Sequence, residues 1–234
     1  MTPTRVIDTQ RLSTLAHEHE RELLQLLHDL NAIPHENGHP GGAANRILRE
    51  LQKAPFESTG VGPAGNLLAR LGSGSHTILL HTQGGAAGAP GLAAALYAGK
   101  LIHELGMYDD FTLWVANSGP MHDSALRDLH ADCLLLAEPT KLCIEMREAP
   151  VEGFLHESHP LVQAAIATYE NLFELPPIVS QAPSPEGPMG IPAIAFGACA
   201  HVDDAGHISI RHLLQAAQFY AAFPTMYVQR IQRP

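Results

Sequence analysis

Polar side chains that can bind a metal or transfer a proton follow four apolar stretches of the sequence. They are His81 after "TILL", the segment "NSGPMHD" (117–123) after "FTLWVA", Glu138 after "CLLLA", and "HVDD" (201–204) shortly after "IPAIAFG". Ligands of an open α/β sheet bind beyond the carboxyl ends of its strands, so we expect these side chains to converge. Imidazole nitrogen and carboxylate oxygen are zinc ligands in hydrolytic sites, which makes a zinc site one hypothesis.

The turn "GGAAGAPG" (84–91) raises a second hypothesis, because a glycine-rich turn between a strand and a helix can direct backbone N–H groups at an anion. A dinucleotide-binding turn would carry G-x-G-x-x-G and an acidic residue about 20 positions later, and a phosphate-binding loop would carry a lysine. This turn has none of these features. No G-x-S-x-G motif marks a catalytic serine at Ser118 or Ser124 either. The pattern therefore favours the metal hypothesis over the anion and serine alternatives.

Hydrophobic periodicity predicts the elements that would position these residues. Leucines at 23, 26, 27 and 30 predict one amphipathic helix over about 10–31, ending before Pro34, and a second helix is predicted over 41–54. Further helices are predicted over 90–106, 121–130, 159–174 and 209–222. Strands are predicted at "FESTGV", "GNLLARL", "TILLHT", "FTLWVAN", "CLLLAEP", "LCIEMR" and "IPAIAFG".

The alternation of apolar strands and helices predicts the fold class. Strands that are apolar almost throughout are typical of a sheet covered on both faces. We expect a three-layer α/β/α fold with a mixed, largely parallel sheet, built as one domain over residues 1–234. The proline-rich segment "APSPEGPMGIP" (182–192) is predicted to be a loop between two strands.

Composition excludes several classes of partner. Asp and Glu number 24 against 14 Lys and Arg, a formal net charge of -10, which disfavours nucleic acid and acidic membrane surfaces. The N-terminus lacks a secretory signal pattern, and no apolar run approaches the length of a membrane span. Three cysteines without a C-x-x-C spacing fit a reducing compartment, so a soluble cytoplasmic protein is expected. Most of the 15 histidines are expected to be solvated.

The order of segments resembles a known family. The chain is similar over almost its whole length to the zinc-dependent aminoacylase, acetylornithine deacetylase and succinyl-diaminopimelate desuccinylase family of metallopeptidases. The branch that it most resembles is the amidohydrolases grouped with hydantoin- and selenium-related metabolism. The segments that carry the resemblance are "LLHDLNAIPHENG", "GNLLARLGSGSHTILLHT", "GLAAALYAGKLIHELG", "FTLWVAN", "LLLAEPTKLCIEMR", "HPLVQAAIATYENLF", "GIPAIAFG" and "LLQAAQFYAAFP".

The resemblance implies three surviving metal ligands. Members of the family bind two zinc ions through an H-x-D histidine, a bridging Asp in D-x-K-G-G, a Glu-Glu pair, the Glu of "EPT" and a C-terminal His. His81 matches the first ligand, Glu138 matches the glutamate of "EPT", and His201 matches the last histidine. No other cofactor is expected, and zinc is the candidate metal.

The same resemblance exposes several losses. Gln83 replaces the Asp of H-x-D, and residues 87–91 ("AGAPG") replace D-x-K-G-G, which removes the bridging carboxylate and its lysine. Met121 and His122 stand at the Glu-Glu pair, whose first member is the general base. Met121 cannot accept a proton from water, so His122 and Asp123 are the weak candidates for proton transfer.

The lid and dimerisation domain of the family follows "EPT", and this chain crosses the insertion point near 148–158 with only a short loop. We expect that domain to be absent, which would admit water and remove contacts that orient a substrate. The favoured interpretation is a non-catalytic homologue that acts as a binding or regulatory module. It would partner a full-length homologue or another enzyme of the same pathway, with a monomer as the default state.

Two alternatives stay open. One is a mononuclear zinc hydrolase that cleaves a small amide or N-acyl amino acid, because three N/O ligands and a water suffice for catalysis. The other is that His81, Glu138 and His201 are only hydrogen-bonded polar residues at strand ends. The helix around "AALYAGKLI" is interpreted as core packing, with Lys100 reaching solvent at its end.

Overall fold

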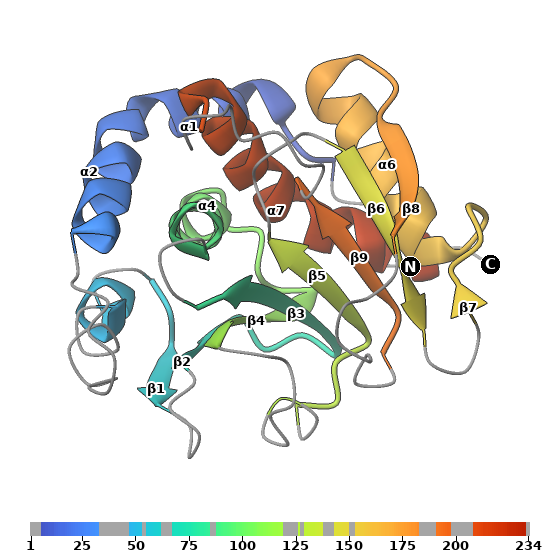
Figure 1. The fold of residues 1–234 in the computed structure, drawn as a ribbon, viewed down its shortest axis with the longest axis horizontal. Coiled ribbons are helices and arrows are strands. Elements are labelled where there is room, and N and C mark those ends of the chain that lie inside the picture. The colour runs from blue at the N-terminus through green and yellow to red at the C-terminus, as the bar shows by residue number, and fades with distance from the viewer. Residues whose placement is uncertain are drawn as a thin grey trace.

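A nine-stranded mixed β-sheet forms the centre of the molecule (Figure 1). The structure, a computed structural model, describes residues 6–32, 47–52, 55–61, 67–84, 88–118, 126, 129–137, 143–149, 153–182, 191–197 and 208–232. The strand order is β1-β2-β4-β3-β5-β9-β6-β7, and β8 also pairs with β6. The strands are β1 (Ser58–Val61), β2 (Leu67–Leu71), β3 (His76–Gln83), β4 (Phe111–Ser118), β5 (Cys133–Ala137), β6 (Cys143–Ala149), β7 (Gly153–Phe154), β8 (Ile178–Ala182) and β9 (Ala193–Phe196).

The four central strands β4, β3, β5 and β9 are parallel neighbours. The register places His81 of β3 opposite Ala116 of β4 on one side and Leu136 of β5 on the other. Because the strands run in one direction, their carboxyl ends share one edge of the sheet, here called the carboxyl edge. Antiparallel pairs of β2 with β4 and of β6 with β9 extend the sheet on both sides.

Helices cover the sheet through two separate hydrophobic cores. The larger core joins alternate side chains of the strands, such as Ile78 and Leu80, to all the long helices. The smaller core lies on the opposite face and contains Leu79, Leu134 and the helical residue Leu126. The predicted three-layer α/β/α class with a mixed sheet is confirmed. The helices are α1 (Thr9–Glu18), α2 (Glu20–Asn31), α4 (Ala89–Glu104), α6 (Pro160–Phe173) and α7 (Ile210–Ile231).

Helix α4 is enclosed on all sides, because it packs between the sheet, α2 and α7. Twelve of its 16 residues are buried. Its small residues allow this close packing: a Cβ on Gly99 would lie 2.4 Å from Cζ of Phe56. A helix that is apolar around its whole circumference is typical of a fully buried element.

Two predicted helices differ from the structure. The helix predicted over 10–31 is broken at His19, whose backbone has φ -94° and ψ 5°. The break lies where the helices contact α4: the hydroxyl of Tyr97 donates to the His19 carbonyl at 2.6 Å. Helix α7 continues nine residues beyond the predicted end at 222 and passes through Pro224. Buried side chains beyond the proline, including Tyr227 and Val228, offset the loss of a backbone hydrogen bond.

Among the described residues, none of the helices combines the length and the hydropathy needed to cross a lipid bilayer.

Candidate functional site at the carboxyl edge of the sheet

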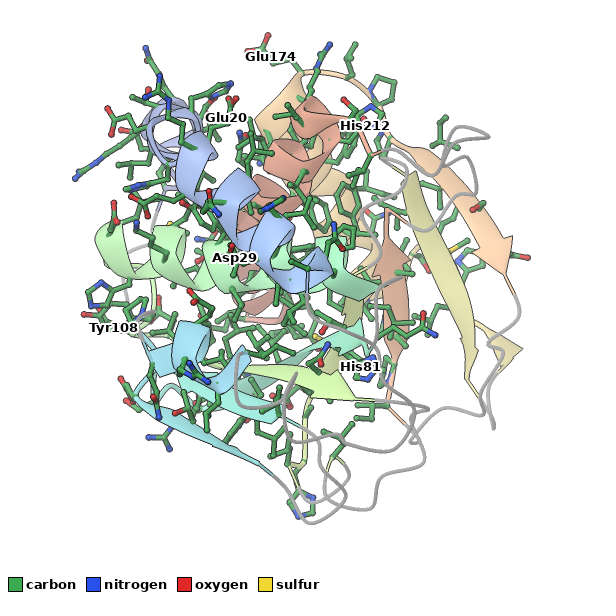
Figure 2. All side chains as sticks on the ribbon, turned by 60° about the vertical axis from the view of Figure 1, so that its left-hand side comes forward. Glu20, Asp29, His81, Tyr108, Glu174 and His212 are labelled. Atoms are coloured by element: carbon green, nitrogen blue, oxygen red, sulfur yellow. The ribbon has the colours of Figure 1, made fainter. Side chains whose placement is uncertain are left out.

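His81 lies two residues before the end of β3 and is buried, with 5% of its surface exposed. Side chains alternate along a strand, so His81 shares a face with Leu79 of the smaller core, and Thr82 faces the larger one. Figure 2 shows His81 on the side of the molecule opposite Tyr108, which follows α4. The structure thus places this predicted ligand at the carboxyl edge.

Neutral hydrogen bonds join the ends of β3 and β4 beside His81. The side-chain amide of Asn117 donates to Oγ1 of Thr82 at 2.8 Å and to the backbone carbonyl of Gln83 at 3.1 Å. The hydroxyl of Thr82 donates in turn to the carbonyl of Ala116 at 3.3 Å. Asn117 therefore uses both of its N–H groups to hold the two strand ends together, a role that the sequence pattern did not reveal.

The turn from β3 to α4 returns so tightly that its last residue contacts the strand end. A Cβ on Gly88 would lie 1.6 Å from the carbonyl oxygen of Gln83, a distance that no side chain can adopt. Gly88 is the N-cap of α4 and has no side-chain cap, and Ala89 behind it is buried. Only a glycine fits at position 88 in this arrangement.

The other predicted site residues lie outside the described residues. Strand β5 ends at Ala137, one residue before Glu138 in the sequence, and β9 ends at Phe196, five residues before His201. His122 and Asp123 also lie outside the described residues. The part of the chain that the structure describes contains no group of three or more His, Cys, Asp or Glu side chains that could hold a metal.

The described residues of this edge offer zinc one imidazole and no carboxylate. His81 offers an imidazole nitrogen, whereas Asn117, Thr82 and Gln83 offer neutral amide and hydroxyl groups, which zinc uses less than imidazole and carboxylate. A mononuclear site would need Glu138 and His201 as its further ligands. A dinuclear site needs a bridging carboxylate, and residues 84–91 contain no Asp or Glu.

A second concentration of polar groups lies at the other end of α4. Lys100 does not simply reach solvent: its ammonium contacts Oε2 of Glu22 at 2.5 Å. Glu104 contacts Nε2 of His19 at 2.9 Å. These contacts join residues about 80 positions apart, so periodicity within one helix gave no signal for them.

Comparison with known proteins supports the fold. No protein-family model matches the chain. YgeY, an uncharacterised protein of Escherichia coli strain K12, is 25% identical over 132 residues, which cover 44% of this chain and 33% of YgeY. The same protein from strain O157:H7 matches equally. The chain spans about a third of the length of these curated relatives.

Solved structures of metallopeptidase type share the fold at low identity. YxeP of Bacillus subtilis, described as a dinuclear metal-binding peptidase of the M20 family, has a TM-score of 0.69 at 10% identity, covering 91% of this chain and 99% of YxeP. The LapA aminopeptidase of Legionella pneumophila has a TM-score of 0.61 at 9% identity, covering 97% and 76%. Glutaminyl cyclase of Macrostomum lignano has a TM-score of 0.59 at 10% identity, covering 99% and 95%. The chain therefore has a metallopeptidase-like fold.

Proposed function

We propose that this chain is a non-catalytic relative of the zinc-dependent amidohydrolases and peptidases, and that it acts as a binding or regulatory module. The observation that carries the proposal is the turn between β3 and α4. By resemblance this turn should supply the bridging carboxylate and a lysine, yet residues 84–91 contain only Gly, Ala and Pro.

The packing of the turn supports the same proposal. Gly88 contacts the Gln83 carbonyl so closely that the backbone has no room for a side chain there. Asn117 already donates both amide hydrogens within the edge. Small residues and neutral hydrogen bonds thus occupy the place where charge would be needed to offset two metal ions.

The short connection after β6 adds a second argument. Strand β6 ends at Ala149 and α6 begins at Pro160, so ten residues, 150–159, separate them, where the family inserts its lid. Without a lid, a substrate would lack contacts that orient it and exclude water. We propose that this chain lacks the lid domain.

The proposed partner is a full-length homologue or another enzyme of the same pathway. Loss of the lid would remove the usual dimer interface of the family, so the free chain is proposed to be a monomer. The described part of the former insertion point is polar: Leu155 is buried, and His156, Glu157 and Ser158 are exposed. This composition disfavours a hydrophobic interface at residues 155–158 and points to another surface for the partner.

A mononuclear zinc hydrolase is the second candidate function, and the strand arrangement favours it. His81 lies two residues before the end of β3, and Glu138 and His201 follow β5 and β9 in the sequence. Strand β5 is a parallel neighbour of β3, and β9 is a parallel neighbour of β5. These three would be the ligands, with His122 or Asp123 as the proton-transfer group. The substrate would be a small amide or an N-acyl amino acid.

Zinc content and hydrolysis, measured together, distinguish the two candidates. Elemental analysis and titration calorimetry would compare the wild type with a His81→Ala/Glu138→Ala double variant. A His76→Ala/Glu57→Ala variant is the matched control, because it removes the same side-chain types far from the carboxyl edge. A panel of N-acetyl amino acids would then be assayed with zinc present.

The proposed function predicts that the wild type binds no tight zinc that is lost in the His81→Ala/Glu138→Ala variant. It also predicts that the rate of hydrolysis does not exceed the rate in zinc-containing buffer alone. Stoichiometric zinc that is lost only in the His81→Ala/Glu138→Ala variant, together with hydrolysis, would contradict the non-catalytic proposal and support the mononuclear zinc hydrolase. Zinc binding without hydrolysis would retain a non-catalytic module and add a metal to it.

A further inference from the structure

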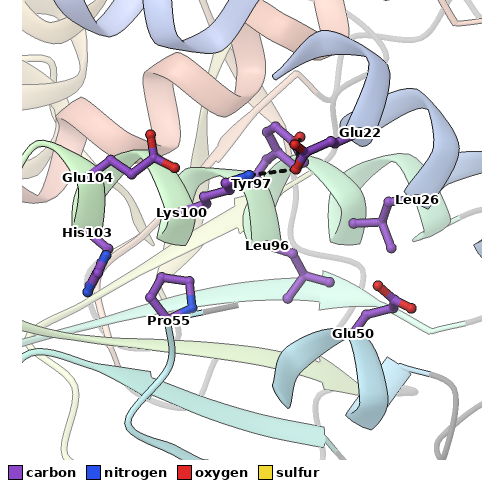
Figure 3. Close-up of a pocket in the computed structure, with 9 residues that line it drawn as sticks. All are labelled: Glu22, Leu26, Glu50, Pro55, Leu96, Tyr97, Lys100, His103 and Glu104. Atoms are coloured by element: carbon purple, nitrogen blue, oxygen red, sulfur yellow. Dashed lines mark hydrogen bonds and ion pairs between the residues drawn. The ribbon is translucent and has the colours of Figure 1, made fainter. Parts of the chain in front are cut away.

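A cavity of about 360 Å³ opens between α2, α4 and the segment before β1 (Figure 3). A cavity of this size suits a small organic molecule. Its lining comes from three parts of the chain that are remote in sequence. The lining residues are Glu22, Leu26, Glu50, Pro55, Leu96, Tyr97, Lys100, His103 and Glu104.

The lining contains both apolar and charged side chains, and Glu50 lies near Leu26 and Leu96 (Figure 3). Leu26, Pro55 and Leu96 provide aliphatic surface, and the ring of Tyr97 adds an aromatic surface. The charged groups are three carboxylates, from Glu22, Glu50 and Glu104, against one ammonium, from Lys100. The lining is therefore amphipathic, with an excess of negative charge.

Contacts between the helices fix several of these side chains in position. The Tyr97 hydroxyl donates to the His19 carbonyl, and burial, followed by the charge of Glu22, raises the pKa of Tyr97, so that the phenol stays neutral. The hydrogen bond from Lys100 lowers the pKa of Glu22, which keeps that carboxylate ionised. Its side chain is 63% exposed, so the ion pair with Lys100 leaves it accessible to a ligand.

We propose that this cavity binds an amphipathic organic cation, a primary ammonium or guanidinium group on a short aliphatic body. The aliphatic body would lie against Leu26, Pro55 and Leu96. The cationic group would bind a carboxylate of the lining, where a charge-assisted hydrogen bond is strong. The net charge of -10 on the whole chain would also favour the approach of a cation.

The charges of the lining disfavour the other ligand classes. A carboxylate ligand would have Lys100 as its one ammonium partner, and Lys100 is already bound to Glu22. It would also face the remaining carboxylates, whose like charge is repulsive. A neutral alcohol could use the apolar side chains of the lining but would gain no ion pairing. This inference does not depend on the proposed function, because the cavity is remote from the carboxyl edge.

Titration with matched probes, followed by amide chemical shifts in NMR, tests the proposal. The probes are n-pentylammonium, n-pentanol and hexanoate, which share an aliphatic body and differ in charge. Glu50→Gln removes one carboxylate of the lining and keeps Glu22 and Glu104, which contact Lys100 and His19. Leu26→Trp fills the cavity from a half-buried position. Glu170→Gln, an exposed position on α6, is the charge-matched control.

We expect n-pentylammonium to give saturable shifts at the amides of α2 and α4 around the cavity. Glu50→Gln should weaken its binding about tenfold, the effect expected for one charged hydrogen bond, and Leu26→Trp should abolish it. Glu170→Gln should leave it unchanged. Absence of saturable shifts, binding of hexanoate at least as tight, or equal effects of Glu50→Gln and Glu170→Gln would overturn the proposal. Circular dichroism of each variant distinguishes loss of binding from loss of folding.

Discussion

The two ends of helix α4 differ in almost every physical property. Its amino end lies at the carboxyl edge of the sheet, where Gly88 and Ala89 pack against the end of β3 with no charged side chain between them. Its carboxyl end carries Lys100 and Glu104, which bind groups on α2 and line a cavity. From Gly88 to Lys100 the helix rises about 18 Å, so the two regions do not touch.

This difference shows where ligand chemistry should be sought. In an open α/β sheet such as this one, the carboxyl edge is the expected place for a ligand. Here the described part of that edge is closed by backbone contacts and neutral hydrogen bonds. Among the described residues, a cavity lined by charged side chains lies at the opposite end of the same helix. The largest effects of substitution on stability are therefore expected at the amino end, and the largest effects on ligand binding at the carboxyl end.

Gly88→Ala should have the largest effect on stability. A Cβ 1.6 Å from the Gln83 carbonyl oxygen forces the backbone of the turn to move, and we expect a loss of about 2–4 kcal/mol in the free energy of unfolding. Urea denaturation measures it. Gly60→Ala is the matched control, because nothing lies within 4 Å of the added Cβ, and it should be neutral or slightly stabilising. Equal effects of the two variants would show that the turn is not tightly closed.

Asn117→Asp should destabilise the carboxyl edge by about 2 kcal/mol. The substitution preserves the shape of the side chain but replaces two donated hydrogen bonds with a carboxylate facing the Gln83 carbonyl. Thermal and urea unfolding at neutral pH would measure the loss. The control is Asn171→Asp, at an exposed position on α6, which should change stability by less than about 0.5 kcal/mol. An Asn117→Asp variant as stable as this control would contradict the proposed role of Asn117.

Tyr97→Phe tests the carboxyl end of α4 and should lower the free energy of unfolding by about 1 kcal/mol. The ring stays buried, and only the hydroxyl that donates to the His19 carbonyl is lost. That carbonyl also accepts the backbone N–H of Leu23, so it keeps one partner. Tyr108→Phe is the control, since its ring stacks on His103 with or without the hydroxyl. If the two phenylalanine variants unfold at the same urea concentration, the Tyr97 hydroxyl does not hold the helices together.

Lys100→Met should have the smallest effect on stability, below about 1 kcal/mol, because its ion pair with Glu22 is largely exposed. The hydrogen bond from Lys100 lowers the pKa of Glu22 from its usual 4.5. The stabilisation is therefore complete above that pH and is lost as the pH falls through the lowered value in the folded state. Urea midpoints of the wild type and of Lys100→Met, at neutral and acidic pH and at low and high salt, would measure the contribution of this ion pair.

In the Lys100→Met variant the loss of stability between neutral and acidic pH should be smaller than in the wild type. High salt should reduce the difference between the two proteins at neutral pH. Arg21→Met, which removes an exposed cation one residue before Glu22 on α2, should leave the pH dependence of stability unchanged. An unchanged pH dependence in Lys100→Met would mean that the ion pair contributes nothing measurable.

The fold could be predicted from the sequence because its signals are local. Strands such as β5, with every residue buried, and helices with an apolar face reveal themselves within a window of a few residues. The two helix errors arose where contacts between elements matter, and strands β7 and β8 were not predicted. The break at His19 lies at a contact with Tyr97 of α4, and α7 continues past Pro224 because the side chains beyond it are buried.

The candidate site was only partly accessible from the sequence. The position of His81 follows from the end of an apolar strand, and the structure places it there. Its role as a ligand stays a prediction, as do the roles of Glu138 and His201. The Asn117 contacts and the cavity beside Lys100 could not be predicted, because each joins residues from different elements whose register is set by packing.

The enclosure of α4 has a consequence for the motions of the protein. Backbone amides of a helix that is covered on all sides reach solvent only when the surrounding layers separate. Hydrogen exchange along the middle of α4, around Ala95, should therefore be among the slowest in the chain and should report its global opening. A ligand that binds only the folded chain, at either end of the helix, would slow exchange at these same central amides. The exchange rates of the central α4 amides would therefore allow binding at the two regions to be compared in one measurement.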